Sequence, residues 1–80
     1  MRIDKYLKVS RLIKRRSVAN EACDQGRITI NGRVVKASYD VKEGDVMEIT
    51  MGERVLKVRV VSVAEHVSKN DASALYEVIN

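Results

Sequence analysis

The 80-residue sequence contains no proline, phenylalanine or tryptophan, and its aromatic residues are Tyr6, Tyr39 and Tyr76. Proteins that bind single-stranded RNA commonly stack bases on aromatic side chains, so this mode has few candidates here. The aromatic RNP1 motif and the Gly-x-x-Gly loop of KH domains are also absent. Tyr6 and Tyr76 occupy apolar positions that predict core packing, whereas Tyr39 falls in a loop beside Lys36. What is left is recognition of structured RNA by shape and phosphate contacts, or of duplex DNA by a helix.

Cysteine and histidine are nearly missing as well, with Cys23 and His66 as single examples. One cysteine cannot form an internal disulfide, and neither residue has neighbours at metal-ligand spacing. Cys23 falls among apolar residues and is predicted to be a small core side chain. No glycine-rich phosphate loop or nucleophile-base pair can be assembled. We therefore expect no catalysis, no metal and no cofactor. We also expect solubilising roles for five carboxylates of the second half: Asp40, Glu43, Asp45, Glu48 and Glu53.

Long apolar runs do not occur either. No run approaches the roughly 18 residues that cross a bilayer. The opening residues, Met-Arg-Ile-Asp-Lys-Tyr-Leu-Lys, carry charges every few positions and lack the apolar region of a secretory signal. We expect a cytoplasmic protein that does not insert into membranes.

What the sequence has in excess is positive charge in its first half. Residues 1–36 hold ten lysines and arginines against three acidic residues, a formal charge of +7, while the remaining residues sum to −3. This asymmetry favours a polyanionic partner for the first half, although a solvated surface, an anionic lipid or an acidic protein would also fit the charge alone. A lipid-lying helix is disfavoured because the charge spreads over two helices and a hairpin. Most of the bases fall in residues 1–16: Arg2, Lys5, Lys8, Arg11, Lys14, Arg15 and Arg16.

Two short helices are predicted at the start of the chain. Ile3, Tyr6 and Leu7 keep helical spacing within residues 2–10, and residues 11–16 are too highly charged to be anything but an exposed connector. Ser17 is predicted to be the N-cap of a second helix that ends at Gly26. The small apolar residues of this second helix would let the first helix approach closely.

Strands are predicted for most of the remainder. Alternating residues on both sides of Asn31-Gly32, a strong hairpin turn signal, predict a strand pair from Arg27 to Lys36. After a turn at residues 41–45, a second hairpin is predicted from residues 46–51 and 55–63. Asp71 is expected to cap a last short helix over residues 72–78, with a terminal strand as the alternative. The order of elements gives an α+β fold, with a two-helix unit packed on a small antiparallel sheet.

Taken together, several segments resemble the RNA-binding domain named after small-subunit ribosomal protein S-four. They are residues 1–8, 11–17, 22, 26–28, 30–32, 36–38 and 41–45, in the order and spacing of that domain. The whole chain is similar to the fifteen-kilodalton heat-shock-protein family, and more narrowly to the bacterial ribosome-quality-control protein P (RqcP, formerly YabO) family. We accordingly expect one RNA-binding domain over residues 1–80, with a core motif at about 2–50. Residues 51–80 would be an extension that completes the sheet and need not touch RNA.

For function, the resemblance implies a non-enzymatic factor that binds stalled large ribosomal subunits holding peptidyl-tRNA. It would keep the tRNA against large-subunit rRNA while RqcH, a NEMF-family protein, supports addition of a carboxy-terminal alanine tail, and we expect it to be a monomer. Carried over by position, Arg2 and Arg16 are the leading RNA contacts. Asp4 would orient a neighbouring arginine or simply favour the helix start by its charge. Supporting contacts are Lys5, Lys8, Arg11, Lys14, Arg15 and Lys36, and weaker candidates are Arg27, Asn31, Arg33 and Tyr39.

Three other functions stay open at this point. The chain could be a recycling factor of the heat-shock type that binds free large subunits carrying nascent chains. It could be a small DNA-binding regulator, because a short basic helix pair also resembles a helix-turn-helix. It could also be a protein-interaction module that uses its acidic second half.

Overall fold

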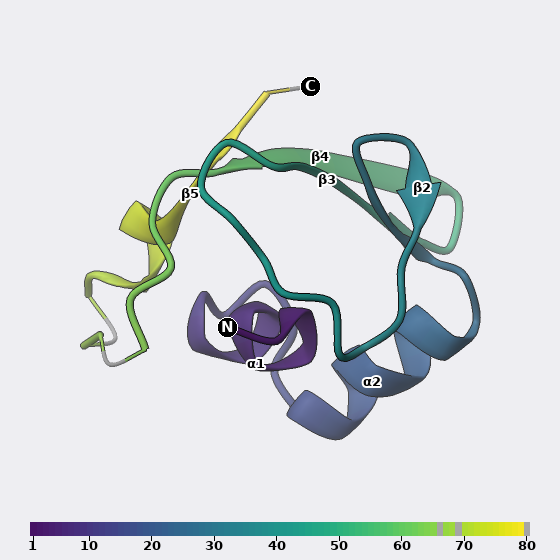
Figure 1. Cartoon of the computed structure of the whole chain (residues 1–80), viewed down its shortest axis with the longest axis horizontal. Helices are drawn as coiled ribbons and strands as arrows, with labels where there is room; N and C mark the ends of the chain where they lie inside the picture. The colour runs from purple at the N-terminus through teal and green to yellow at the C-terminus, as the bar shows by residue number, and fades with distance from the viewer. Residues whose placement is uncertain (66, 69, 80) are drawn as a thin grey trace.

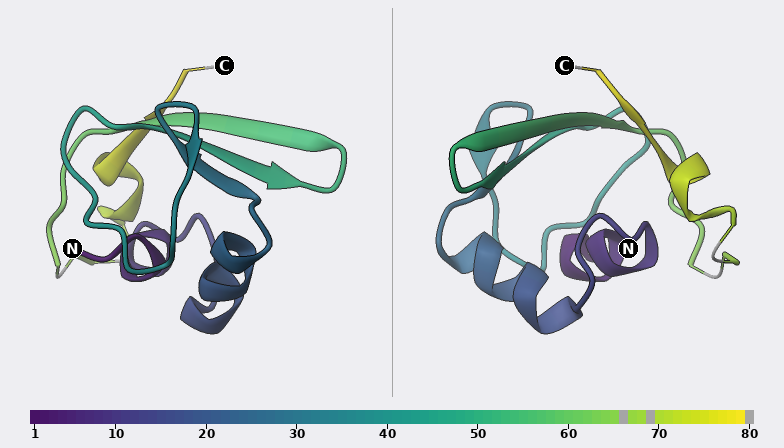
Figure 2. Two further views of the ribbon diagram at one scale, coloured as in Figure 1. Left: turned by 45° about the vertical axis from the view of Figure 1, so that its right-hand side comes forward. Right: turned by 180° about the vertical axis from the view of Figure 1, so that it is seen from behind.

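The computed structural model describes residues 1–65, 67–68 and 70–79, so His66, Lys69 and Asn80 are outside the described residues. Two helices, α1 (Ile3–Val9) and α2 (Arg16–Asp24), lie side by side and cover one face of a sheet (Figures 1 and 2). The predicted α+β fold is therefore confirmed. Within the described ranges, no helix is long and apolar enough to cross a membrane.

The sheet has five antiparallel strands in the order β2-β1-β3-β4-β5. Their bounds are β1 (Ile28–Ile30), β2 (Arg33–Val34), β3 (Val46–Met51), β4 (Arg54–Val60) and β5 (Tyr76–Val78). Asn31 and Gly32 have positive φ angles of 52° and 85°, which is the type I′ geometry that Asn-Gly favours between two strands. The predicted first hairpin is thus confirmed, and its register aligns Ile28 with Ile49 and Ile30 with Met47.

The core lies between the helices and the sheet. Ile3, Tyr6 and Leu7 of α1 are fully buried, as are Met47 and Val58 of the sheet. Because side chains alternate along a strand, the buried positions of β1, β3 and β4 all face α1 and α2. Burying a large aliphatic side chain contributes about 1.5–3 kcal/mol. The helices are therefore fixed to the sheet by α1 above all.

Cys23 of α2 belongs to this core, as predicted, and is 3% exposed. Burial, with smaller contributions from the charges of Asp4 and Asp24, raises the pKa of its thiol to about 11. At neutral pH the thiol is protonated, and it packs as a small apolar side chain.

The predicted start of α2 is wrong by two residues, and its predicted end is correct. Ser17 is not the N-cap: α2 begins at Arg16, and Arg15 holds the cap position in extended conformation without a side-chain cap bond. At the other end Gly26, with a φ of 73°, donates its N–H to the Cys23 carbonyl at 3.0 Å. Arg27 donates its N–H to the Ala22 carbonyl at 2.9 Å, which completes a Schellman-type helix end.

The C-terminal prediction is corrected as well. Asp71 caps no α-helix, because residues Ala72–Leu75 form a 3-10 helix (η1) and β5 follows at once. The Leu75 carbonyl accepts hydrogen bonds from the Tyr6 hydroxyl at 2.7 Å and from the Val61 N–H at 2.8 Å. Strand β4 therefore ends at Val60 and not at the predicted residue 63. The same bonds hold the end of η1, from which the chain continues into β5. The strand alternative holds for residues 76–78.

Candidate nucleic-acid interface

The two arginines expected to lead RNA binding meet on one buried carboxylate. The Asp4 side chain is 3% exposed, and its Oδ1 and Oδ2 atoms accept hydrogen bonds from Arg2 Nε and Nη2 at 3.2 and 3.3 Å. Arg16 Nη2 lies 3.3 Å from Oδ1, and Asn20 Nδ2 lies 3.4 Å from Oδ2. The side chains of Arg2 and Arg16 stay 51% and 45% exposed. Two arginine side chains are therefore held together, and about half of each side chain is still open to solvent.

Three segments of the chain position this cluster. Asp4 lies in the first turn of α1, where the Lys5 N–H also donates to its Oδ1 at 2.8 Å. Arg16 and Asn20 are one turn apart on α2 and so point from the same side of that helix. The loop between β2 and β3 covers the start of α1, because the Asp4 N–H donates to the Ala37 carbonyl at 3.3 Å. The arginine pair is consequently built on packed elements rather than on a free terminus.

The Asp4 carboxylate is ionised because its hydrogen-bond donors lower its pKa by more than burial raises it. Burial is the largest single influence and raises its pKa. The hydrogen bonds from Arg16 and Asn20, the Arg16 charge and the Lys5 N–H together reverse this effect and lower the pKa below its usual 3.8. At neutral pH the cluster thus combines two arginine charges with one carboxylate and remains net positive.

The other bases of the first 16 residues occupy the end of α1 and the connector to α2. Lys5 is half-buried, with Nζ 3.5 Å from Glu65 Oε1, whereas Lys8 is exposed in the last turn of α1. Arg11 and Lys14 are exposed in the connector, as predicted, and Arg15 is exposed at the start of α2.

A second polar cluster lies beneath the first hairpin turn. The Tyr39 hydroxyl donates to Asp45 Oδ2 at 2.9 Å, and Asn31 Nδ2 donates to Oδ1 at 3.4 Å. Asn31 Oδ1 in turn accepts the Val46 N–H at 3.0 Å. Burial, and then the hydrogen bond to Asp45, raise the pKa of Tyr39. These bonds attach the β2–β3 loop to the hairpin, so the polar groups of Asn31 and Tyr39 are used within the protein.

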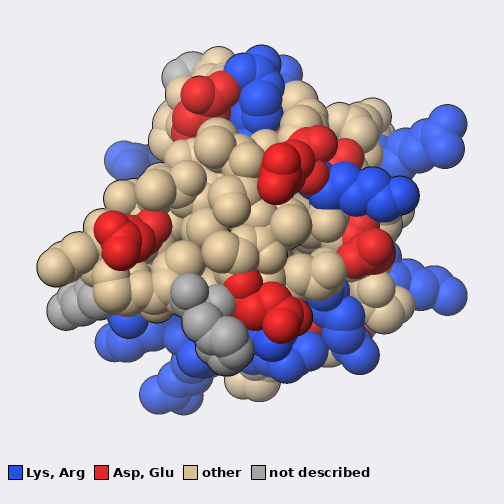
Figure 3. All heavy atoms as spheres, turned by 60° about the vertical axis from the view of Figure 1, so that its left-hand side comes forward, with Lys and Arg blue, Asp and Glu red and all other residues tan. Residues whose placement is uncertain are grey.

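The remaining candidates are not brought together into one site. Arg33 lines a shallow depression of about 360 Å³ beside Asn31 and Tyr39, and Lys36 is exposed in the loop that follows β2. Arg27 is half-buried before β1, and its buried Nε has no hydrogen-bond partner among the residues the structure describes. In Figure 3 the basic side chains in view gather mainly along the helix side and one margin of the molecule, around a broad face with scattered acidic groups.

Residues 1–47, which contain both helices and the first hairpin, match the S4 domain model. The chain belongs to the S4 domain family. This membership confirms the resemblance stated from the sequence, and it places the Asp4 cluster inside the matched S4 domain.

The similarity of this S4 domain protein to its relatives extends beyond residue 47. A protein of Halalkalibacterium halodurans named RQC P-site tRNA stabilizing factor is 58% identical over 78 residues, which cover 98% of this chain and 89% of that protein. A Streptococcus pneumoniae protein of the same name is 50% identical over 80 residues, covering 100% and 91% of the two chains. The narrower resemblance to that family is thereby confirmed.

A solved structure supports the same relationship. Heat Shock Protein 15 of Vibrio cholerae, described as trimeric, matches with a TM-score of 0.91 and 25% identity, covering 99% of this chain and 81% of that one. The resemblance to the fifteen-kilodalton heat-shock family is therefore also confirmed.

Two acidic residues of this S4 domain protein hold more hydrogen-bond partners in place than the sequence indicated. Asp4 was expected to orient one arginine at most, yet it holds Arg2 and Arg16 together. Asp45, assigned a solubilising role, is 9% exposed and anchors Asn31 and Tyr39. The sequence feature that could have predicted the role of Asp4 is its position next to the core residue Ile3 in a short basic helix.

Proposed function

We propose that this chain is a non-enzymatic RNA-binding factor of ribosome-associated quality control that holds peptidyl-site tRNA against large-subunit rRNA. The observation that carries this proposal is the similarity to two relatives named RQC P-site tRNA stabilizing factor. The alignments with them cover at least 98% of this chain. An S4 domain occurring as a module in some unrelated enzyme would not produce a match of that extent.

The Asp4 cluster supplies the physical basis for RNA binding. Arginine recognises phosphate through two parallel N–H bonds, which lysine cannot reproduce. Because Asp4 already orders Arg2 and Arg16, less side-chain entropy is lost when they bind phosphates. Residues 2–50 would form the RNA-binding core, with Asn31 and Tyr39 contributing least because they hydrogen-bond internally. Further phosphate contacts would come from Lys5, Lys8, Arg11, Lys14, Arg15 and Lys36, and weaker ones from Arg27 and Arg33.

In this proposal the chain acts as a monomer beside RqcH, which brings alanyl-tRNA while this chain retains the peptidyl-tRNA. Deleting the gene should abolish alanine tails on stalled nascent chains, and the wild-type gene should restore them. Arg2→Ala combined with Arg16→Ala should not restore them. A matched control, Lys42→Ala with Arg54→Ala, removes two exposed charges outside the cluster and should restore tailing. Undiminished tailing in the deletion strain would reject the proposal.

The likeness to Heat Shock Protein 15 favours one second candidate. A recycling factor of that type would associate with free large subunits carrying nascent chains without supporting elongation. Sedimentation of lysates through a gradient, combined with the tailing assay, separates the two, because a recycling factor cosediments with such subunits while tailing continues in its absence. Duplex DNA included as a competitor against tRNA tests the DNA-binding alternative in the same preparation.

A further inference from the structure

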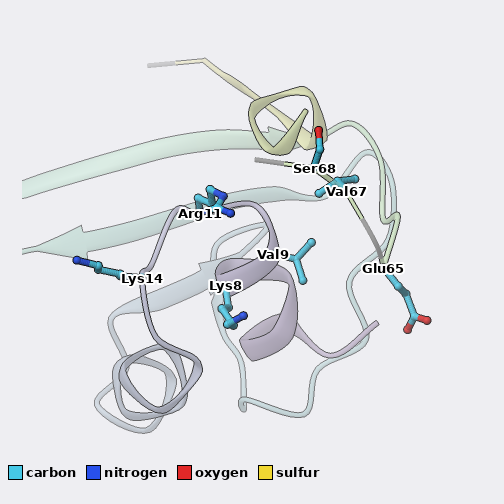
Figure 4. A pocket seen from close by; sticks show the side chains of 7 residues that line it. All are labelled: Lys8, Val9, Arg11, Lys14, Glu65, Val67 and Ser68. Atoms are coloured by element: carbon cyan, nitrogen blue, oxygen red, sulfur yellow. The ribbon is translucent and has the colours of Figure 1, made fainter. Parts of the chain in front are cut away.

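A groove separates the end of α1 and the connector from the C-terminal segment. Its volume is about 700 Å³, within the roughly 300–1,000 Å³ typical of sites for small ligands. Figure 4 shows its two banks, which come from parts of the chain more than 50 residues apart. The lining residues are Lys8, Val9, Arg11 and Lys14 on one bank and Glu65, Val67 and Ser68 on the other.

The first bank carries cations that are not neutralised. Unlike the two arginines on Asp4, Lys8, Arg11 and Lys14 have no ion-pair partner in the described part of the chain. Arg11 has a φ of 63°, a left-handed conformation that usually belongs to glycine at a helix end. Its N–H donates to the Lys8 carbonyl at 3.0 Å, which closes the last turn of α1. An arginine therefore occupies a position where glycine would be less strained, and it adds a charge at the rim of the groove.

Among the residues that the structure describes, Glu65 is the one charged side chain that lines the second bank. The Glu65 side chain points away from them in Figure 4, and its carboxylate lies 3.5 Å from Lys5 Nζ. The Ser68 hydroxyl donates to Asp71 at 2.8 Å, and Val67 is partly buried against the core. Val9 and Val67 give the groove apolar surface between the cationic bank and the described residues of the second bank. This distribution suits a sugar-phosphate strand with its phosphates toward α1 and its riboses toward the C-terminal bank.

The groove is also separate from the arginine pair. Helix α1 has seven residues, so at 1.5 Å per residue its two ends lie roughly 10 Å apart. Arg2 precedes the first end, and Arg11 follows the second. Phosphates bound in the groove would therefore be additional to those bound by Arg2 and Arg16.

We propose that this groove binds the sugar-phosphate backbone of an RNA strand, so that the C-terminal segment takes part in RNA recognition. The inference rests on the proposed function and extends it, because Glu65, Val67 and Ser68 lie outside the residues 1–47 that match the S4 domain. It also revises the expectation that residues 51–80 only complete the sheet.

A gain of charge on the second bank gives the sharper test. Ser68→Lys should tighten binding of a tRNA transcript roughly five- to eightfold at 0.1 M salt and steepen the salt slope by about 0.7–0.9, since each phosphate contact releases about that much counterion. Ser73→Lys is the matched control, because Ser73 is exposed on η1 and does not line the groove. Equal affinities of the two variants would overturn the role of the C-terminal bank.

A loss of charge tests the first bank. Lys8→Ala with Lys14→Ala should weaken tRNA binding about 25- to 60-fold at 0.1 M salt and flatten the slope by about 1.4–1.8. Lys42→Ala with Arg54→Ala should leave both nearly unchanged. If the groove variant behaves like this control while Arg2→Ala with Arg16→Ala still weakens binding, the groove inference fails and the proposed function stands. If the wild-type protein binds neither tRNA nor isolated large subunits, the proposed function itself fails.

Discussion

Replacing Asp4 by asparagine separates two explanations of RNA affinity, because they predict changes of opposite sign. If affinity followed charge alone, removing one carboxylate from the basic surface would tighten RNA binding and steepen its salt dependence. If affinity depends on where Arg2 and Arg16 are held, the same substitution should weaken binding. The side chains are nearly isosteric, so the comparison changes charge and hydrogen bonding with little change in volume.

The expected size of the effect follows from the geometry at Asp4. The carboxylate receives hydrogen bonds from Arg2, Lys5, Arg16 and Asn20, and a neutral amide would hold the arginines less firmly. Immobilising a long side chain on binding costs about 0.5–1.5 kcal/mol, so freeing both arginines should cost about 1–3 kcal/mol of binding free energy. That corresponds to roughly 5- to 150-fold weaker binding. Because both arginines are about half exposed, the loss of folding stability should be smaller, about 1–2 kcal/mol.

The assay is a salt titration of tRNA binding, with urea unfolding to establish that the variant is folded under the binding conditions. Asp24→Asn is the matched control, because Asp24 is exposed at the end of α2, whereas Arg2 and Arg16 form their ion pairs with Asp4. It should bind RNA as tightly as the wild-type protein or slightly more tightly. A folded Asp4→Asn variant that binds RNA as well as Asp24→Asn would refute the positioning role of Asp4.

Four further outcomes are expected. Arg11→Gly should leave the free energy of unfolding unchanged or raise it by up to about 1 kcal/mol, because glycine accepts the left-handed conformation. The same substitution should weaken tRNA binding roughly five- to eightfold. A loss of stability in urea unfolding would show that Arg11 is not strained. The folded-state pKa of Asp4 is lowered, so its stabilisation is complete above the unfolded pKa and is lost as the pH falls through the folded one. The stability difference between wild type and Asp4→Asn, measured by urea unfolding from pH 7 to pH 2, should therefore be constant above about pH 5 and shrink below pH 4. Cys23, with a pKa of about 11, should resist iodoacetamide at pH 7.5 in the native protein and react in 6 M urea, as mass spectrometry would record. Tyr6→Phe should cost about 1 kcal/mol in urea unfolding because the hydrogen bond to the Leu75 carbonyl is lost, and a neutral result would mean that this bond contributes nothing net.

The fold was predictable where local residue chemistry decides the outcome. Asn31-Gly32 can adopt the two positive φ angles of a tight hairpin, and Gly26 can adopt the one that ends α2. Ser17 failed as a predicted N-cap because a long-range contact overrode local preference: Arg16 is drawn into the helix, where its side chain reaches Asp4. The C-terminal prediction failed for a similar reason, since the Leu75 carbonyl is engaged by Tyr6 from the far end of the sequence.

In the candidate site, the exposure of most basic side chains was predictable from the sequence, and the structural roles of the acidic side chains were not. The run of lysine and arginine residues is visible in the sequence, and solvation keeps such side chains at the surface wherever the fold places them. The partners of Asp4 come from two helices, and those of Asp45 from a hairpin turn and a loop. Such pairings depend on tertiary packing, so the sequence alone could not distinguish an organising carboxylate from a solubilising one.

The hydrogen bond from Tyr6 to Leu75 also has a consequence for how the protein is made. It joins residues that lie 69 positions apart, and it links the helix that begins the S4 domain to the turn before β5. During synthesis, α1 is translated long before Leu75 has been added. The apolar face of α1 therefore cannot be buried against β3 and β4 until those strands have been translated. The arginine pair on Asp4 should therefore acquire its fixed geometry only after β4 and Leu75 have been added to the chain.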